Sequence, residues 1–272
     1  MLIGGSNFVM VRFSNAELAP FWGAALRFLP AAALLFVAMG IWRVPVPRGS
    51  ALVGAVIYGA LNFGLSYGLS YVGLQRATAG TASVMIATVP LWTFFLAIAH
   101  GLERFRARAL VGTIVATVGV GIVFVEQLSA DVPIASLLAM LGGAVAAAEA
   151  TVVAKRFPRT HPLSTNAVGT LVGGAILMAL SLAVAAAHPL PQRPETQLAL
   201  AYLATVGAVG LFALFLFVLG RWRASAASYA LVVMPLVAIA LGALLRGEAV
   251  SPFFIAGALV VGAGVYVGAL SG

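Results

Sequence analysis

Residues 76–103, RATAGTASVMIATVPLWTFFLAIAHGLE, return in altered form at residues 221–248, RWRASAASYALVVMPLVAIALGALLRGE. Alanine and valine matches arise readily by chance in such an apolar chain, whereas arginine, proline and glutamate are scarce in it. These scarce residues recur at an offset of 145 positions: Arg76 with Arg221, Pro90 with Pro235, and Glu103 with Glu248. The stretch therefore belongs to a duplicated unit that carries a proline inside an apolar span of each copy.

The repeat extends beyond this stretch in both directions. The same offset joins Gly112 to Gly257 and Gly119 to Gly264, and an offset of 144 joins Arg12-Phe13 to Arg156-Phe157. We therefore expect two repeats, at residues 1–128 and 129–272.

The composition is that of an integral membrane protein. Of the 272 residues, 62% are hydrophobic and 8% are charged, which is more apolar surface than one soluble core can bury. The net charge of +8 does not indicate a nucleic-acid partner, because the basic residues lie singly or in small groups between apolar runs. The absence of cysteine excludes disulfides and thiolate metal sites, and we expect no metal and no cofactor.

Breaking the chain at charges, prolines and polar clusters predicts an all-α protein with ten transmembrane helices. The expected spans are 2–13, 18–42, 51–74, 77–100, 109–125, 134–154, 163–187, 198–219, 225–245 and 253–270. The first is shorter than the roughly 20 residues that a bilayer core requires. Either the sequence begins inside this helix, or neighbouring helices shelter it.

The basic residues predict the orientation, because cytoplasmic loops retain them. One set of alternate loops holds ten: Arg43, Arg48, Arg104, Arg106, Arg108, Lys155, Arg156, Arg159, Arg221 and Arg223. The opposite set holds four: Arg12, Arg76, Arg193 and Arg246. Both termini are expected in the cytoplasm, with loops 126–131 and 188–195 outside. Arginine outnumbers lysine fourteen to one, which indicates a GC-rich bacterial genome and hence a bacterial inner membrane.

An odd number of spans in each copy makes the second copy enter the membrane from the opposite side. Inverted repeats of this kind recur in secondary transporters, where the halves exchange conformations to open a shared cavity alternately to each side. The repeat therefore predicts a 5+5 inverted architecture and a carrier of small molecules that works by alternating access.

Several short motifs, in this order and at this offset, resemble the EamA-type transporters of the drug/metabolite transporter superfamily. They are Gly5-Ser6-Asn7, Ala25-Leu26-Arg27-Phe28, the Ala-Ser pairs before Pro90 and Pro235, Glu103, and Gly247-Glu248 with the glycine-bearing spans that follow. The resemblance covers nearly the whole chain. It implies a basket of ten helices, with the fifth and tenth packed outside, that exports or exchanges amino acids, other metabolites or drugs without a bound cofactor.

Two positions depart from the family pattern. Ile3 precedes Gly4 where a tryptophan is usual, and Glu149 stands where many members place an aromatic residue.

Two ionisable side chains fall well inside spans, where charge is costly and suggests function. Arg27 could anchor a carboxylate or phosphate on the substrate, or form a structural ion pair or helix-cap contact. Glu149 lies six residues before Lys155, nearer the cytoplasmic side than the midplane. It could exchange a proton in a proton-coupled antiport, or neutralise Arg27 or a basic loop residue.

Polar side chains mark a candidate substrate pathway. In the third span they recur at steps of four, which keeps them on one helix face, either as a cavity wall or for hydrogen bonding between helices. The candidates there are Tyr58, Asn62, Ser66, Tyr67 and Tyr71, and weaker ones elsewhere are Thr81, Trp92, Asn166 and Tyr229.

Pro90 and Pro235 each remove a backbone hydrogen bond, and equivalent helix breaks in two halves point to a transporter's binding region. Glu103 and Glu248 end their spans beside arginines and are expected to pair with Arg104 or Arg246. Glycines spaced by four, such as Gly169 with Gly173, let helices approach closely and would also allow a homodimer.

Three other functions were weighed against a carrier. An intramembrane enzyme is disfavoured, because the three histidines lie near span ends or in loops and no nucleophile or metal-ligand motif occurs. A channel is disfavoured because nothing resembles a ring of carbonyls or like charges. A lipid flippase or an accessory membrane subunit could use the same repeat and stays open.

Overall fold

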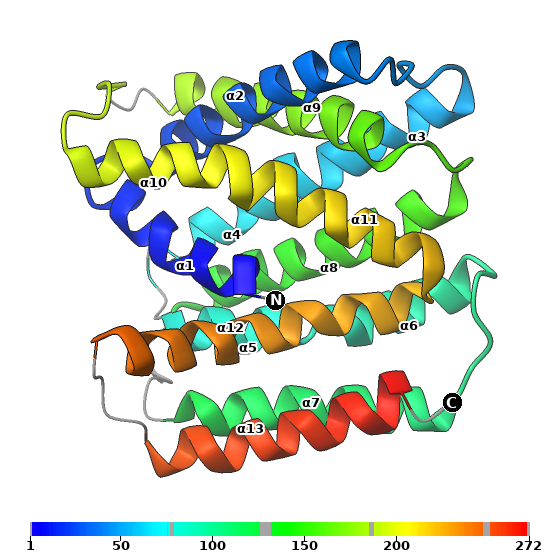
Figure 1. Ribbon diagram of the computed structural model, residues 1–272. Coiled ribbons are helices and arrows are strands. Elements are labelled where there is room, and N and C mark those ends of the chain that lie inside the picture. The colour runs from blue at the N-terminus through cyan, green and yellow to red at the C-terminus, as the bar shows by residue number, and fades with distance from the viewer. Residues whose placement is uncertain are drawn as a thin grey trace.

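The protein is a bundle of helices that run side by side in alternating directions (Figure 1). The computed structural model describes residues 2–74, 76, 79–125, 132–184, 188–246 and 251–270, and contains no strand within them. The expected loop 126–131 and the pair Gly247-Glu248 lie outside the described residues.

The first half of the chain forms seven α-helices and one π-helix. They are α1 (Leu2–Asn15), α2 (Pro20–Ile41), α3 (Ser50–Gly59), η1 (Ala60–Leu65), α4 (Ser66–Leu74), α5 (Ala79–Ala87), α6 (Val89–Ala99) and α7 (Ala107–Val123). The fourth expected span is thus divided into α5 and α6 at Thr88, just before Pro90.

The second half repeats this order with one fewer break. Its elements are α8 (Ile134–Arg156), α9 (Pro162–Ala183), α10 (Pro194–Ala204), η3 (Thr205–Gly210), α11 (Leu211–Arg221), α12 (Ala224–Arg246), α13 (Pro252–Val265) and η4 (Tyr266–Leu270). Pro235 lies inside the single helix α12, so the two prolines do not divide their helices alike. Proline at the first turn begins α2, α9, α10 and α13, where its missing N–H costs nothing.

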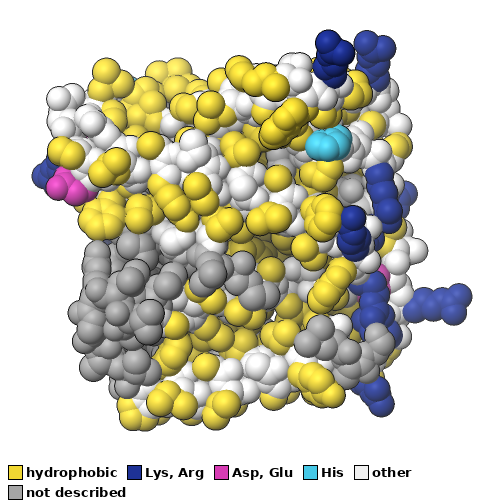
Figure 2. Space-filling view, viewed as in Figure 1, with side chains coloured by type: hydrophobic (Ala, Val, Ile, Leu, Met, Phe, Trp, Pro, Cys, Tyr) yellow, Lys and Arg dark blue, Asp and Glu magenta, His cyan; other side chains and the backbone are white. Residues whose placement is uncertain are grey.

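Six continuous helical segments among the described residues are long and apolar enough to cross a membrane, and two of them join two α-helices through a π-helix. They are Pro20–Ile41, Ser50–Gly73, Ile134–Arg156, Pro162–Ala183, Pro194–Arg221 and Pro252–Ala269. Their outward side chains are apolar, and Ile134, Leu198 and Leu259 each expose more than 70% of their surface. Figure 2 shows this apolar face, with Lys and Arg gathered along the edge at which α6 and α11 end. We call that side the basic edge and the opposite side the outer edge.

The two π-helical segments η1 and η3 occupy equivalent positions in the repeat. Residue 60 corresponds to residue 205 and residue 65 to residue 210, an offset of 145 in each case. A π-helical turn is a rare feature that is frequently found at functional sites. Its recurrence at the repeat offset shows that the duplication extends to backbone geometry.

Helices α7 and α13 pack antiparallel through glycines. A Cβ on Gly112 would lie 2.6 Å from the carbonyl oxygen of Gly264, and one on Gly119 would lie 3.0 Å from that of Gly257. The repeat offset relates Gly112 to Gly257 and Gly119 to Gly264. The contact between Gly112 and Gly264 is therefore equivalent, under the repeat, to the contact between Gly119 and Gly257. Helices α2 and α9 also pack antiparallel, with Leu29 against Gly174 near the middle of the pair and Met39 in a cluster with Leu163 at one end.

We expect Gly112→Ala to destabilise the protein by about 1–3 kcal/mol, because the added methyl would meet backbone atoms of α13 and η4 that cannot move aside. The matched control is Gly121→Ala on the same helix, where a Cβ meets nothing within 4 Å. Thermal unfolding of the purified protein in detergent would measure both variants. Equal midpoints for the two variants would contradict the close packing of α7 on α13.

Candidate functional site

Arg27 lies in α2 with only 2% of its surface exposed. Its guanidinium donates to the carbonyl oxygen of Gly207 at 3.3 Å and lies 4.9 Å from the ring centre of Phe28 and 5.7 Å from that of Tyr67. Its Nε has no hydrogen-bond partner, and within the described part of the chain no carboxylate lies at ion-pair distance. A permanently charged side chain is thus buried with cation–π contacts and one carbonyl as its main compensation.

The carbonyl that holds Arg27 belongs to the π-helix η3 and also accepts from α1. Asn7 Nδ2 donates to Gly207 O at 3.0 Å, while Asn7 Oδ1 is buried without a partner. Helices α1 and α2 therefore meet η3 at a single carbonyl. The substrate pathway expected from the sequence did not include Asn7, although the Gly5-Ser6-Asn7 motif marked its position.

The aromatic residues expected along the pathway fill the core beside Arg27. Tyr58 is 1% exposed, Tyr71 is buried, and Asn62 Nδ2 donates to Tyr58 OH at 3.5 Å. Phe63 packs between Phe28, at a tilt, and Phe212, edge to face, with ring centres 5.0 and 4.6 Å apart. Ser66 is also buried, so this face of the third span is directed into the protein.

The weaker candidates are scattered. Asn166 is fully buried in α9 and neither of its amide atoms has a hydrogen-bond partner. Trp92 packs beside Val89 with its Nε1 unpaired, and Thr81 is buried in α5. Tyr229 in α12 shares a hydrogen bond of 2.8 Å with Thr113 of α7. The structure therefore does not bring these four residues to one place.

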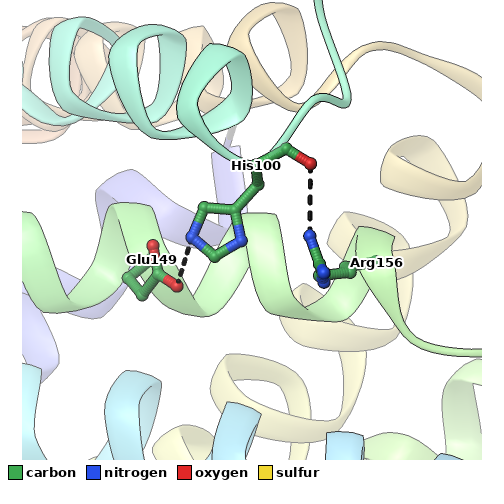
Figure 3. A network of polar contacts seen from close by, with 3 residues as sticks. All are labelled: His100, Glu149 and Arg156. Carbon is green, nitrogen blue, oxygen red and sulfur yellow. Dashed lines mark hydrogen bonds and ion pairs between the residues drawn. The ribbon is translucent and has the colours of Figure 1, made fainter.

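Glu149 pairs with His100 rather than with Arg27 or a basic loop residue. Figure 3 shows the carboxylate of Glu149 in α8 facing His100, with 3.1 Å between Oε1 and Nε2. The neighbouring Arg156 donates to the His100 carbonyl at 3.2 Å, so α8 holds this residue at both its side chain and its backbone. From the sequence, His100 is a residue near a span end, and its separation of 49 positions from Glu149 gives no sign of this contact.

Glu103 caps a helix of the other half. Its carboxylate accepts hydrogen bonds from the backbone N and the Oγ of Ser225, at 3.0 and 2.5 Å. This contact at the start of α12 was not anticipated, since the expected partner was Arg104. Glu248, the repeat equivalent of Glu103, lies outside the described residues.

A cavity of about 560 Å³ opens at the basic edge between the two halves. It is bounded by the start of α3, the segment 157–162 that joins α8 to α9, and the end of α11. None of the pathway residues expected from the sequence lines this cavity. A second cavity of about 470 Å³, lined mainly by apolar side chains of α11 and α12, includes Tyr229.

The equivalent surface at the outer edge is closed. Offsets of 144 and 145 convert His161 and Ala51, which line the cavity, to Glu17 and Thr196. The carboxylate of Glu17 accepts from the backbone N of Gln192 at 2.6 Å and of Arg193 at 3.3 Å, where α10 begins. Thr196 is 1% exposed, so the groove that is open at the basic edge is packed shut here.

A second contact reinforces this closure. Trp22 Nε1 donates to the carbonyl of Pro189 at 2.7 Å, and its ring lies against His188, 5.0 Å between centres. The loop before α10 is therefore attached to the first half by two side chains.

The family model described as "EamA-like transporter family" matches residues 1–125 and 134–269. The chain belongs to the EamA-like transporter family.

Relatives of this EamA-like protein are distant but match over most of their length. It is 26% identical to the "Uncharacterized inner membrane transporter YedA" of Escherichia coli (strain K12), over 92% of this chain and 81% of that protein. It is 26% identical to a "Probable amino-acid metabolite efflux pump" of Salmonella typhimurium, over 98% and 91%. A solved crystal structure matches its fold with a TM-score of 0.86 at 18% identity, covering 99% of this chain and 93% of that one.

The hydrogen bonds that Glu17 accepts from the side chain of Thr196 and the backbone of Gln192 lower its pKa from the usual 4.5. A carboxyl with a lowered pKa in the folded state adds stability above its unfolded pKa, and this stability is lost as the pH falls through the folded value. We therefore expect the thermal midpoint to fall on acidification below about pH 4.5, and to fall less in Glu17→Gln. Midpoints measured from pH 3 to pH 7 test this; Glu195→Gln, which leaves this contact intact, is the control. Parallel curves for wild type and Glu17→Gln would refute the role of this contact.

Proposed function

We propose that this EamA-like protein is a secondary active transporter that exports small metabolites by alternating access. Ten transmembrane helices in two inverted five-helix repeats, at residues 1–128 and 129–272, form the carrier, with both termini in the cytoplasm of a bacterial inner membrane. The observation that supports this most is the open groove at the basic edge beside its closed equivalent at the outer edge. Two copies of one structural unit in opposite states are what alternating access requires.

The antiparallel pairs support the inverted arrangement. The two-fold axis that relates the halves interchanges α7 and α13, as the equivalent contacts of Gly112 and Gly119 require. Because these two helices are antiparallel, the axis lies perpendicular to both. Such an axis lies in the membrane plane when the helices cross the bilayer. The concentration of Lys and Arg at the open edge supports placing that edge on the cytoplasmic side. In this proposal the open groove therefore corresponds to an inward-open state.

In this proposal Arg27 anchors a carboxylate on the cargo. Its buried charge lacks an anionic partner among the described residues, and an anionic group would supply the missing compensation. Amino acids and related metabolites carry such a group, and the relative from Salmonella is named for an amino-acid metabolite. The ring of Tyr67 lies beside Arg27, and Asn7 donates to the same Gly207 carbonyl as Arg27 does. In this proposal both would shape the pocket around the carboxylate.

Glu149 with His100 is the proposed route for a coupled proton. The pair is partly exposed, with 25% of the glutamate side chain and 30% of the histidine side chain accessible, so protons can reach it from the basic edge. Protonation of Glu149 would remove the charge from its contact with His100 and weaken one of the polar contacts that hold α6 on α8. That contact joins the two halves, which makes it a suitable link between proton binding and closure.

Transport into proteoliposomes tests the function, with amino acids, purine compounds and cationic drugs as cargo. We expect uptake of a carboxylate-bearing cargo to fall at least about tenfold in Arg27→Gln, since the anchor is lost. Glu149→Gln should retain cargo exchange but lose accumulation driven by a proton gradient. Accumulation by Glu149→Gln at the wild-type level would dismiss the coupling, and no uptake of any cargo by the wild type would dismiss the carrier.

Labelling of single cysteines tests the alternation, because the native chain contains none. Ala51 borders the open groove, and Ala199, on the equivalent outer face, is fully buried. A water-soluble maleimide should label Ala51→Cys about tenfold faster or more than Ala199→Cys, because burial restricts access to the second site. Adding Glu17→Gln should raise the rate at Ala199→Cys and lower it at Ala51→Cys. Independent changes at the two sites would speak against a coupled exchange of states.

The second cavity supports a different candidate, movement of lipid. Its apolar wall includes Leu214, Val218 and Trp222, whose side chains are exposed on the outer surface of the bundle. Transfer of a fluorescent phospholipid between leaflets, measured in the same proteoliposomes, distinguishes a flippase from a metabolite carrier.

A further inference from the structure

The cavity at the basic edge has walls of one charge sign. Its charged lining residues are Lys155, Arg159 and Arg221, and none of its lining residues, all of which are described, is an Asp or Glu. The charge of Glu103 acts on Lys155, and the Glu103 carboxylate is already bound to Ser225. The cavity thus holds an excess of formal positive charge that no lining carboxylate neutralises.

The three cations differ in what they already bind. Lys155 Nζ donates to the carbonyls of Leu219 and Trp222 at the end of α11, which offsets the partial negative charge of that helix end. Arg221 lies over the ring of Phe217, 3.5 Å from its centre, and donates to a carbonyl. Arg159 is exposed, and its side chain has no hydrogen bond or ion pair with any described residue. Arg159 is therefore available to a ligand.

The rest of the wall suits an apolar group on the same ligand. Phe157, Leu216 and Leu219 contribute apolar surface next to the cations. The helices α3 and α9 begin at this cavity with the positive ends of their dipoles, and α8 and α11 end there with basic side chains in their last turns, which offset the negative ends.

Membrane orientation alone does not explain this arrangement. Cytoplasmic loops hold Lys and Arg in general, yet that rule does not require them to converge on a cavity free of acids. The repeat does not require it either, because the residue equivalent to Arg159 at the outer edge is Asn15, at an offset of 144.

We propose that this cavity binds an organic anion, a carboxylate or phosphate joined to an apolar body, as the cytoplasmic access site of the carrier. Arg159 and Arg221 attract the anionic group, and Phe157 and Phe217 contact the apolar body. The inference rests on the proposed transport function and extends it, because it selects anionic over neutral and cationic cargo before the cargo reaches Arg27. A cleft lined by one sign of charge concentrates the field within it and raises the local concentration of the opposite ion.

The charge of the cavity can be measured without knowing the cargo. In the otherwise cysteine-free protein, Ala51→Cys places one thiol in the cavity wall. Two methanethiosulfonate reagents of similar size, one carrying a sulfonate and one a trimethylammonium group, then react with it in detergent at about 0.15 M salt. The control is Ala107→Cys, which is exposed at the same edge between Arg106 and Arg108 but does not line the cavity.

We expect the ratio of anionic to cationic reaction rates to be about tenfold or more higher at Ala51→Cys than at Ala107→Cys. Adding Arg159→Gln should lower the ratio at Ala51→Cys towards the control value. Equal ratios at the two sites, or a ratio unchanged by Arg159→Gln, would overturn the proposal.

Protection by small probes tests binding itself. Phenylacetate or phenyl phosphate should slow modification of Ala51→Cys by neutral methyl methanethiosulfonate, and the stronger of the two identifies the preferred anionic group. Phenylacetamide, a neutral analogue of phenylacetate, should give no protection, and Arg159→Gln should remove that of the anions. Equal protection by phenylacetate and phenylacetamide, or none by either anion, would overturn the proposal.

These results separate the anion site from the carrier. A neutral cavity in a protein that transports cargo refutes only the anion site. An anion-binding cavity in a protein that transports nothing leaves the site and refutes the carrier.

Discussion

A polar backbone group in hydrocarbon has no water to bind, and this constraint governs the whole molecule. Every described span is helical because a helix satisfies its own N–H and C=O groups. Where the α-helical pattern changes at η3, side chains complete the bonding: Asn7 and Arg27 both donate to Gly207. The hydrogen bond from Arg27 to Gly207 also places a guanidinium deep in the protein. The irregular turn and the buried charge are therefore one feature, and they occur where the two halves meet.

Contacts between the halves differ at the two edges. At the outer edge Glu17 and Trp22 hold the loop before α10 against the first half. At the basic edge the contacts between the halves lie beside the groove: Glu149 of α8 binds His100, and Glu103 caps α12 at Ser225, while the groove beside α3 stays open. Each closing contact is a few hydrogen bonds at the membrane surface, where water can replace them at small cost. Contacts this weak can break at one edge while equivalent contacts form at the other. The glycine contacts between α7 and α13 bring two backbones together and are suited to remain in place.

The repeat, the helical order and the family could all be predicted from the sequence, because scarce residues such as Arg76 and Pro90 recur at one offset. The depth of Arg27 and Glu149 also followed from their positions in apolar runs. Their partners did not. Glu149 was weighed against Arg27, yet it binds His100, which lies 49 positions away and reaches it only because α6 packs on α8. The π-helices could not be predicted either, because Ala60–Leu65 and Thr205–Gly210 share no residue at equivalent positions that would mark the turn.

The sequence by itself determined that this chain is a duplicated membrane protein with two ionisable side chains inside its apolar spans. Both the lengths of the apolar runs and the offset of the repeat can be read directly along the chain. Only the tertiary structure decided which groups meet: Arg27 with Gly207, Glu149 with His100, Glu103 with Ser225. It also decided which of two equivalent grooves is open. The reason is physical, since both copies encode nearly the same unit. A difference of conformation between them depends on a few contacts across the interface, and no local pattern in either copy records it.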